Sequence, residues 1–241
     1  MAYSMVFAPV LSRAPELVQG TISTITLSAQ AITAGVAIGL AVALARFDGP
    51  RWLGTIGAVY IEAFRNTPLL VQLFLLFFGL PYLGPRLSAD HAAIIAISLN
   101  LGAYSAEIFR AGLLAIPKTQ IEAGLALGLS RMQVMRYIVM LPALRIVYPA
   151  LTGQLTLTLL GTSVASAISA TELTLAGSKI ESQTFRSLET FLVIAAIYIC
   201  VTFAFRLLYA LIGFWLFRRR PAPSSATAAV MATGEPWRAG A

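Results

Sequence analysis

Cysteine, histidine and charge are all scarce in this chain of 241 residues. The single cysteine, Cys200, excludes an internal disulfide framework and a cysteine-rich metal site, and the single histidine, His91, excludes a multi-histidine site. Charged residues make up only 11% of the chain, whereas ordinary globular domains carry about 25%. We therefore expect no metal site, and a soluble all-α protein is the disfavoured alternative.

The chain is instead rich in apolar sequence, with 58% hydrophobic residues and a mean hydropathy of +0.81. Several apolar runs approach the roughly 20 residues that cross a bilayer as a helix. Lipid offers the backbone no hydrogen-bonding partner, so spanning segments are helices or a closed barrel, and the period-2 alternation of barrel strands is absent here. The sequence therefore predicts an all-α membrane protein with about five transmembrane helices, at about 20–45, 56–80, 91–113, 143–169 and 190–216.

The net charge of +7 is distributed as an orientation signal and not as a nucleic-acid-binding face, so we expect no nucleic-acid partner. In the loops and span ends, eleven basic residues lie on one side of the predicted membrane and four on the other. The positive-inside rule places the richer side, with Arg218 to Arg220, in the cytoplasm. Residues 1–19 are then periplasmic. The small, polar tail at 221–241 is expected to be a disordered cytoplasmic segment.

One water-compatible stretch, QIEAGLALGLSRMQVMRYIVMLP, separates the third and fourth spans on the cytoplasmic side. Thr119 and Glu122 have capping-box spacing, Gly128 suits a helix C-terminus, and Ser130 and Gln133 form a second capping box. These signals predict two short helices with a break between them, and the apolar residues recur on one face. The pattern leaves two interpretations open: a helix lying on the membrane surface, or a docking element for a groove on a cytoplasmic partner.

Polar side chains inside the predicted spans are candidates for a solute pathway. They are Gln72, Asn100, Tyr104, Glu107, Gln154, Thr158, Thr162, Ser163 and Ser166. Those of the third span share one helical face, and those of the fourth recur mainly at intervals of four. Glu107 can pair with Arg110, three residues on, and interhelical hydrogen bonding is an equally good explanation for the hydroxyl stripe. Gly35 and Gly39 match the G-x-x-x-G packing pattern.

Several motifs in order resemble the permease subunits of bacterial ABC importers, above all those for polar amino acids. YIEAFRNTPLLVQLFLLFFGLP (Tyr60–Pro81) is similar to that family's second-span signature. NLGAYSAEIFRAGLLAIPKTQIEAGLALGLS (Asn100–Ser130) resembles its third span and EAA loop, with a hydrophobic helix expected to end at Leu141-Pro142. TSVASAISATEL (Thr162–Leu173) resembles the end of its fourth span. The resemblance covers about Gly20 to Arg220.

The resemblance implies the transmembrane domain of a type I ABC importer, with a permease domain at 20–220 and a coupling loop at 114–142. The loop residues expected to couple to an ATPase are Gln120, Glu122, Ala123, Gly124, Leu125, Gly128, Leu129 and Ser130. Implied partners are a dimer of ATPase subunits, a second permease subunit, identical or homologous, and a periplasmic solute-binding protein. The complex would import a small polar amino acid or a close derivative across the inner membrane by alternating access.

The chain itself carries no G-x-x-x-x-G-K-[ST] phosphate loop, so the resemblance assigns ATP and Mg to the partner ATPase. We expect no cofactor and no enzymatic activity in this chain. The first alternative is a secondary transporter or channel subunit, which would want an inverted repeat or an ion relay. The second is an intramembrane enzyme, which would need a catalytic set of residues that the sequence does not suggest.

Three departures from the family pattern stand out. Gly124 replaces the last alanine of the EAA motif, and Leu141-Pro142 lies one residue further from the loop glycine than is common. Leu160-Gly161 stands where many members have Lys-Asp, which removes two charges near the expected pathway. The charge of the substrate therefore does not follow from the resemblance.

Overall fold

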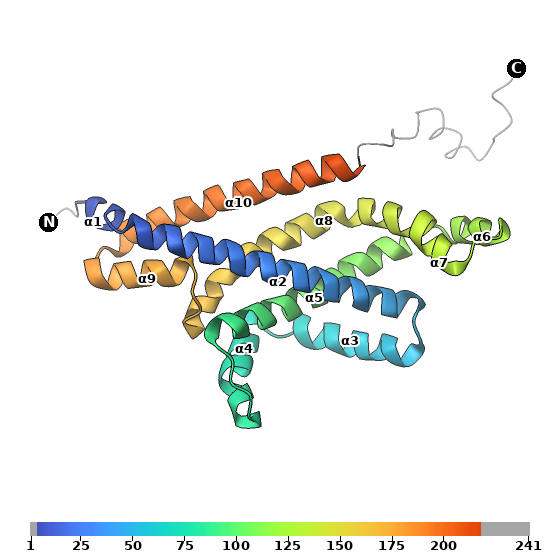
Figure 1. Ribbon diagram of the computed structural model, residues 1–241, viewed down its shortest axis with the longest axis horizontal. Coiled ribbons are helices and arrows are strands. Elements are labelled where there is room, and N and C mark those ends of the chain that lie inside the picture. The colour runs from blue at the N-terminus through green and yellow to red at the C-terminus, as the bar shows by residue number, and fades with distance from the viewer. Residues whose placement is uncertain (1–3, 218–241) are drawn as a thin grey trace, which may run out of the picture. The chain divides into compact units, whose positions relative to one another are not determined.

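The computed structural model describes residues 4–217, and every regular element among them is helical (Figure 1). Four helices are long and apolar enough to cross a membrane, or five if one bent pair counts as a span. They are α2 (Ala14–Asp48), α5 (Ala89–Leu114), the helix Arg131–Ile168 and α10 (Ser187–Phe217), with a bent pair at Arg51–Arg65 and Leu69–Leu83. The predicted tail at 221–241 and Arg218 to Arg220 lie outside the described residues.

The chain forms two units, which divide between Arg206 and Leu207 within α10. In its described part, the second unit is the end of that helix. The packing and the sites described below all belong to the first unit.

The predicted second span, at 56–80, is broken and not straight. It consists of α3 (Arg51–Arg65), α4 (Leu69–Phe74), the π-helical turn η1 (Leu75–Gly79) and the 3-10 turn η2 (Leu80–Leu83), with a bend of 106° after α3. Pro68 is the cause, because a proline lacks the N–H that would continue the helix and keeps the residue before it out of the helical conformation. Pro68 itself has extended backbone and is the N-cap of α4.

Helices α2 and α5 pack against each other through small residues. Gly35 and Gly39 of α2 are buried, Gly35 against Leu101 and Gly39 against Ser105 and Ala106 of α5. Without a hydrophobic driving force between helices in lipid, small residues stabilise such pairs because they let the backbones approach closely. The G-x-x-x-G interpretation is therefore confirmed as the contact between these two helices.

Replacing Gly39 by alanine should destabilise the protein by about 2 kcal/mol, as overpacking does. A Cβ there would lie 2.9 Å from the Ala106 nitrogen and 2.9 Å from the Gly102 carbonyl oxygen, and backbone atoms cannot rotate away. The matched control is Gly153→Ala in α8 (Met140–Gly161), where an added Cβ meets no atom within 4 Å. Thermal unfolding of the detergent-solubilised variants measures both changes, and an equal effect of the two would contradict the packing account.

A helix that sequence reasoning missed, α9 (Leu173–Thr184), precedes α10. Its N-cap is Glu172, which is 1% exposed. The carboxylate accepts hydrogen bonds from the backbone N–H groups of Thr174 (2.7 Å) and Leu175 (2.6 Å) and from the Tyr198 hydroxyl (2.9 Å). Burial raises the pKa of the Glu172 carboxyl, and these donors oppose the rise. The cap therefore ties α9 to α10.

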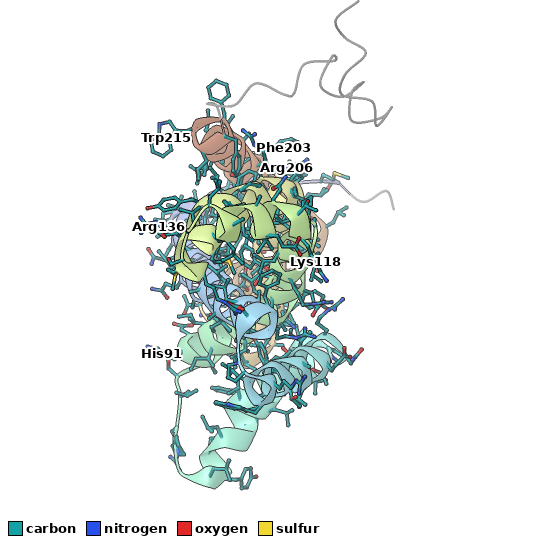
Figure 2. All side chains as sticks on the ribbon, turned by 90° about the vertical axis from the view of Figure 1, so that its right-hand side faces the viewer. His91, Lys118, Arg136, Phe203, Arg206 and Trp215 are labelled. Atoms are coloured by element: carbon teal, nitrogen blue, oxygen red, sulfur yellow. The ribbon has the colours of Figure 1, made fainter. Side chains whose placement is uncertain are left out.

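Within the first unit, two sets of short helices lie at opposite ends of the long ones (Figure 1). One end carries α6 (Lys118–Ala126) and α7 (Arg131–Gln133), and the other carries α1 (Ala8–Leu11) and α9. Figure 2 looks onto the first end, with Lys118 and Arg136 on opposite flanks of it. The predicted loop therefore projects from one end of the bundle.

The resemblance predicts that the second loop helix ends at Leu141-Pro142, but in the structure this helix continues. It continues from α7 through the π-helical segment η3 (Val134–Val139) into α8 and the 3-10 segment η4 (Thr162–Ile168). A π-helical turn widens the helix just before Pro142, which lacks an N–H to bond to the preceding turn. The predicted second helix is thus the first part of the fourth span.

Candidate functional site

The candidate coupling site is the corner formed by α6, α7 and the turn between them. Helix α6 begins at Lys118, after Pro117 at its N-cap, and has no side-chain cap. The predicted capping box of Thr119 and Glu122 is therefore wrong, because Thr119 already lies inside the first turn. The predicted box of Ser130 and Gln133 is confirmed: each side chain bonds the other residue's backbone N–H, at 3.3 and 2.8 Å.

The turn of the corner is a Schellman motif centred on Gly128, whose φ is +81°. The Gly128 N–H donates to the Leu125 carbonyl (3.0 Å), and the Leu129 N–H donates to the Gly124 carbonyl (3.2 Å). These two bonds satisfy the last carbonyls of α6, and a residue without a Cβ adopts the required conformation without strain. Ser130 then starts α7 at once, so the corner is fixed on both sides of the glycine.

Gly124, which replaces the family's alanine, is the buried residue of the predicted coupling set. A Cβ at this position would lie 3.1 Å from Val134 Cγ2 and would collide with the end of the Ile138 side chain. The departure from the family pattern therefore brings α6 closer to η3. Leu129 is half-buried. The remaining predicted residues are exposed: Gln120, Glu122, Ala123, Leu125, Gly128 and Ser130.

Two exposed apolar side chains at the corner were not singled out from the sequence as coupling residues. Leu127 is 83% exposed and Met132 is 75% exposed, on either side of Gly128. Two apolar groups beside a fixed turn are suited to enter a groove on a partner. The corner therefore presents a preformed turn with apolar residues directed outward.

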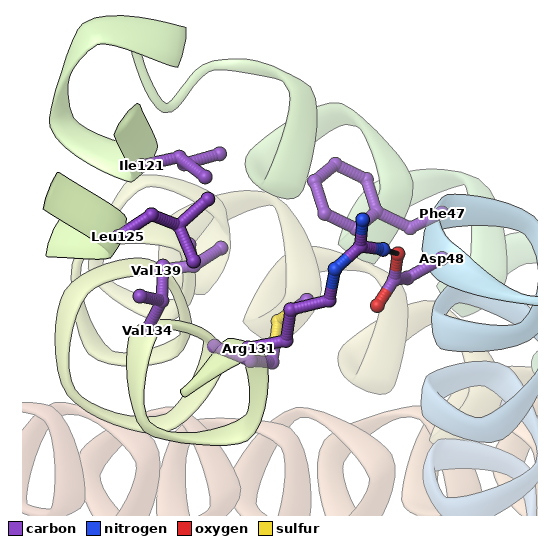
Figure 3. Close-up of a pocket in the computed structure, with 8 residues that line it drawn as sticks. Phe47, Asp48, Ile121, Leu125, Arg131, Val134 and Val139 are labelled. Carbon is purple, nitrogen blue, oxygen red and sulfur yellow. Dashed lines mark ion pairs between the residues drawn. The ribbon is translucent and has the colours of Figure 1, made fainter. Parts of the chain in front are cut away.

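A groove of about 270 Å³ lies between the corner and the end of α2 (Figure 3). Ile121 and Leu125 line it from α6, and Phe47 lines it from α2. At its rim Arg131 pairs with Asp48 (Nη1–Oδ1 3.6 Å), across exposed side chains. The pair links α7 to the end of α2, although exposed pairs of this kind stabilise by less than about 1 kcal/mol.

A second candidate site is a hollow of about 470 Å³, with a mainly apolar lining from α3, α5 and α8 and four polar residues among it. It brings together three predicted pathway residues, Tyr104, Glu107 and Gln154, with Arg65. The Arg65 guanidinium carbon lies 5.5 Å from the centre of the Tyr104 ring, a cation–π distance. The hollow therefore offers a cation, a carboxylate and neutral hydrogen-bonding groups in one place.

Glu107 forms a three-residue ionic cluster beside this hollow. It pairs with Arg110 (Oε2–Nη2 3.0 Å), as its spacing predicts, and also with Arg46 of α2. Arg46 is 61 residues away in sequence, so no local pattern could have indicated it. The cluster ties α2 to α5 at the end nearer the corner.

Gln72 and Asn100 contact each other, and they lie at the break between α3 and α4 and not in the hollow. The Gln72 amide donates to the Phe64 carbonyl (2.8 Å) and to Thr67 (carbonyl 3.0 Å, hydroxyl 2.8 Å), which crosses the break between α3 and α4. Asn100 of α5 donates to the Gln72 side-chain oxygen (3.1 Å). The structure therefore joins these two predicted pathway residues at the bend and not in the hollow.

The predicted hydroxyl stripe has α-helical geometry only as far as the end of α8, because the helix becomes 3-10 at Thr162. Thr158 and Thr162 are buried, while Ser163 and Ser166 are half-buried. All four hydroxyls donate to carbonyls of their own helix, at 2.7–3.0 Å. Neither these residues nor Leu160-Gly161 line the hollow described above.

Residues 35–218 match the family model described as "Binding-protein-dependent transport system inner membrane component". The chain belongs to this family. It is 38% identical over 190 residues to the glutamine transport system permease protein of Escherichia coli (strain K12), which covers 78% of this chain and 87% of that protein. It is 37% identical over 213 residues to the octopine transport system permease protein of Rhizobium meliloti, at 85% and 87% coverage.

A solved structure supports the same assignment. The crystal structure of an amino acid ABC transporter with histidines matches with a TM-score of 0.80 and 34% identity, covering 88% of this chain and 99% of that one. The family resemblance and the helical importer fold predicted from the sequence are thereby confirmed. The chain is a multi-pass inner-membrane permease of the ABC class, and its relatives imply an ATPase and a binding protein as partners.

Proposed function

We propose that this permease subunit imports a polar amino acid or a close derivative by alternating access, driven by ATP hydrolysis on a partner. The observation that carries the proposal is the corner at Gly128: a turn with satisfied backbone, exposed apolar flanks and a direct continuation into a membrane span. Such a corner suits a groove on an ATPase subunit, and the helix behind it transmits a rigid-body movement.

The proposal includes an orientation in the membrane and a set of partners. The eleven-to-four distribution of basic residues supports a cytoplasmic corner and a periplasmic amino terminus. A pair of ATPase subunits would then bind ATP and Mg, hydrolyse the ATP and dock on the corners of two permease subunits, identical or homologous. A periplasmic binding protein would deliver the solute at the opposite end.

The polar residues in the lining of the hollow support an amino acid as the solute. Arg65 supplies a cation for a carboxylate, and Tyr104 and Gln154 supply hydrogen-bonding groups for an ammonium or an amide. Glu107 lines the same hollow and holds Arg46 and Arg110 at its edge. Two relatives are named for glutamine and octopine transport, and both solutes belong to this chemical class. The other predicted pathway residues would act at the α3–α4 bend and along α8.

Reconstitution of the permease in liposomes, with the ATPase and the binding protein encoded by adjacent genes, tests this function. Labelled glutamine, octopine and other polar amino acids are offered outside, with ATP enclosed with the ATPase. We expect uptake that depends on ATP and on the binding protein, and ATP hydrolysis that the loaded binding protein stimulates. Uptake that persists without the ATPase would refute the proposal and favour a secondary transporter or channel.

A further inference from the structure

Phe185 has a backbone conformation that aromatic residues rarely adopt. It follows α9 with φ 55° and ψ 30°, in the left-handed region that glycine and asparagine normally occupy. Its N–H donates to the Glu181 carbonyl (2.8 Å), which ends the helix. A bulky side chain makes this cap costly, and such strain is often found where the residue has a function outside its own backbone.

The turn around Phe185 is fixed by hydrogen bonds on both sides. Before it, the Glu181 carboxylate accepts from the Ser187 hydroxyl (2.6 Å). After it, Arg186 pairs with the buried Glu189 (3.4 Å) and donates to the Ser4 carbonyl (3.2 Å). Residues of α9, α10 and the amino-terminal segment therefore hold the Phe185 backbone in place.

The Phe185 side chain is nevertheless 84% exposed, so packing within the chain does not compensate for the strain. Ser182, Gln183 and Ser187, which surround it in sequence, are exposed polar residues. The turn connects α9 to α10, at the end of the first unit opposite the α6–α7 corner (Figure 1). If the corner faces the ATPase, this turn faces the side from which the binding protein approaches.

A lipid headgroup layer is the other environment that favours an exposed aromatic ring. It has no preference for one fixed ring position, since an aromatic residue partitions into that layer equally well from an unstrained helical turn. A protein partner does gain from a fixed ring, because a preorganised side chain loses less freedom on binding, and aromatic residues often dominate such interfaces. Strain combined with a fastened backbone therefore favours a protein.

We infer that Phe185 is a fixed contact for the periplasmic binding protein, inserted into an apolar depression on that protein when the two associate. The inference rests on the proposed function, because it needs the corner in the cytoplasm and the α9–α10 turn in the periplasm. It assigns to one side chain the recognition of the partner at this end.

Phe185→Asn tests the contact, because asparagine tolerates the left-handed backbone and removes only the ring. The complete transporter in lipid nanodiscs is titrated with its binding protein, loaded from a mixture of the twenty common amino acids and octopine. We expect the half-saturating concentration of binding protein for ATP hydrolysis to rise roughly tenfold, with the maximal rate recovered at high concentration. The control is Phe191→Ala in α10, where the replaced aromatic residue is also exposed. This variant should leave the half-saturating concentration of binding protein unchanged.

Two outcomes would overturn the inference. One is an unchanged half-saturating concentration in Phe185→Asn while wild-type transporter responds to the binding protein. The other is a loss of membrane insertion or stability in Phe185→Asn that Phe185→Trp restores, while the binding-protein titration does not change. That result would mark a membrane contact. If wild-type transporter itself does not respond to its binding protein, the proposed function fails, which is a separate result.

Discussion

Replacing Gly128 by valine should lower the rate of ATP hydrolysis that the binding protein stimulates, on the order of 100-fold. A misplacement of functional groups by about 1 Å can cause a loss of this size. Valine at a φ of +81° is strained, because its branched Cβ meets the neighbouring carbonyl oxygen. The turn would reorganise and move the exposed residues Leu127 and Met132 away from the ATPase groove. The reconstituted complex measures the rate, and co-purification measures ATPase assembly.

Gly128→Asn is the matched variant, since asparagine adopts the left-handed conformation at little cost. It should retain most of the stimulated rate. A second control, Gly153→Ala, adds a methyl group in open space on α8 and should hydrolyse ATP as the wild type does. If Gly128→Val assembles and hydrolyses ATP normally, the corner is not the coupling element.

Glu107→Ala should lower the free energy of unfolding by about 2 kcal/mol, more than the loss of an exposed ion pair and less than the loss of a fully buried one. The side chain is only 23% exposed, and its removal leaves the guanidinium groups of Arg46 and Arg110 near each other without their shared carboxylate. Denaturation of the detergent-solubilised protein measures the loss. Glu107→Gln should cost less, because one oxygen still accepts a hydrogen bond.

The control for this second prediction is Glu16→Ala. Glu16 also pairs with an arginine three residues away, Arg13, at 2.7 Å, but these side chains are 41% and 44% exposed. Exposed pairs contribute little, so the expected loss is below about 1 kcal/mol. Similar losses for Glu16→Ala and Glu107→Ala would show that burial and the second arginine have no effect.

Local features of this chain were predictable because short-range chemistry determines them. The hydropathy runs marked the spans, and the Ser130–Gln133 box and Gly128 marked the break in the loop. The spacing of Glu107 and Arg110 indicated their ion pair. Each of these signals depends on residues within one or two turns of each other, where sequence separation fixes the geometry.

The rest depends on neighbours that are distant in sequence or on competing local signals. Arg46 meets Glu107 only because α2 and α5 pack closely, and nothing near Arg46 indicates it. The Thr119 capping signal failed because Pro117, two residues earlier, is already the N-cap of the helix. The Phe185 conformation was unpredictable in principle, since propensity argues against an aromatic residue there. Which candidate residues carry solute or bind the ATPase stays a prediction.

The helix Arg131–Ile168 has a further consequence for timing. Its 38 residues form one continuous helix, with a π-helical segment near one end and a 3-10 segment at the other, from the α6–α7 corner to the turn at Ser169. A movement applied at the corner is then carried along the backbone of one continuous helix and needs no relay through changing side-chain contacts. We therefore expect the inner and outer faces to move in step, with no long-lived state in which only one of them has responded to ATP.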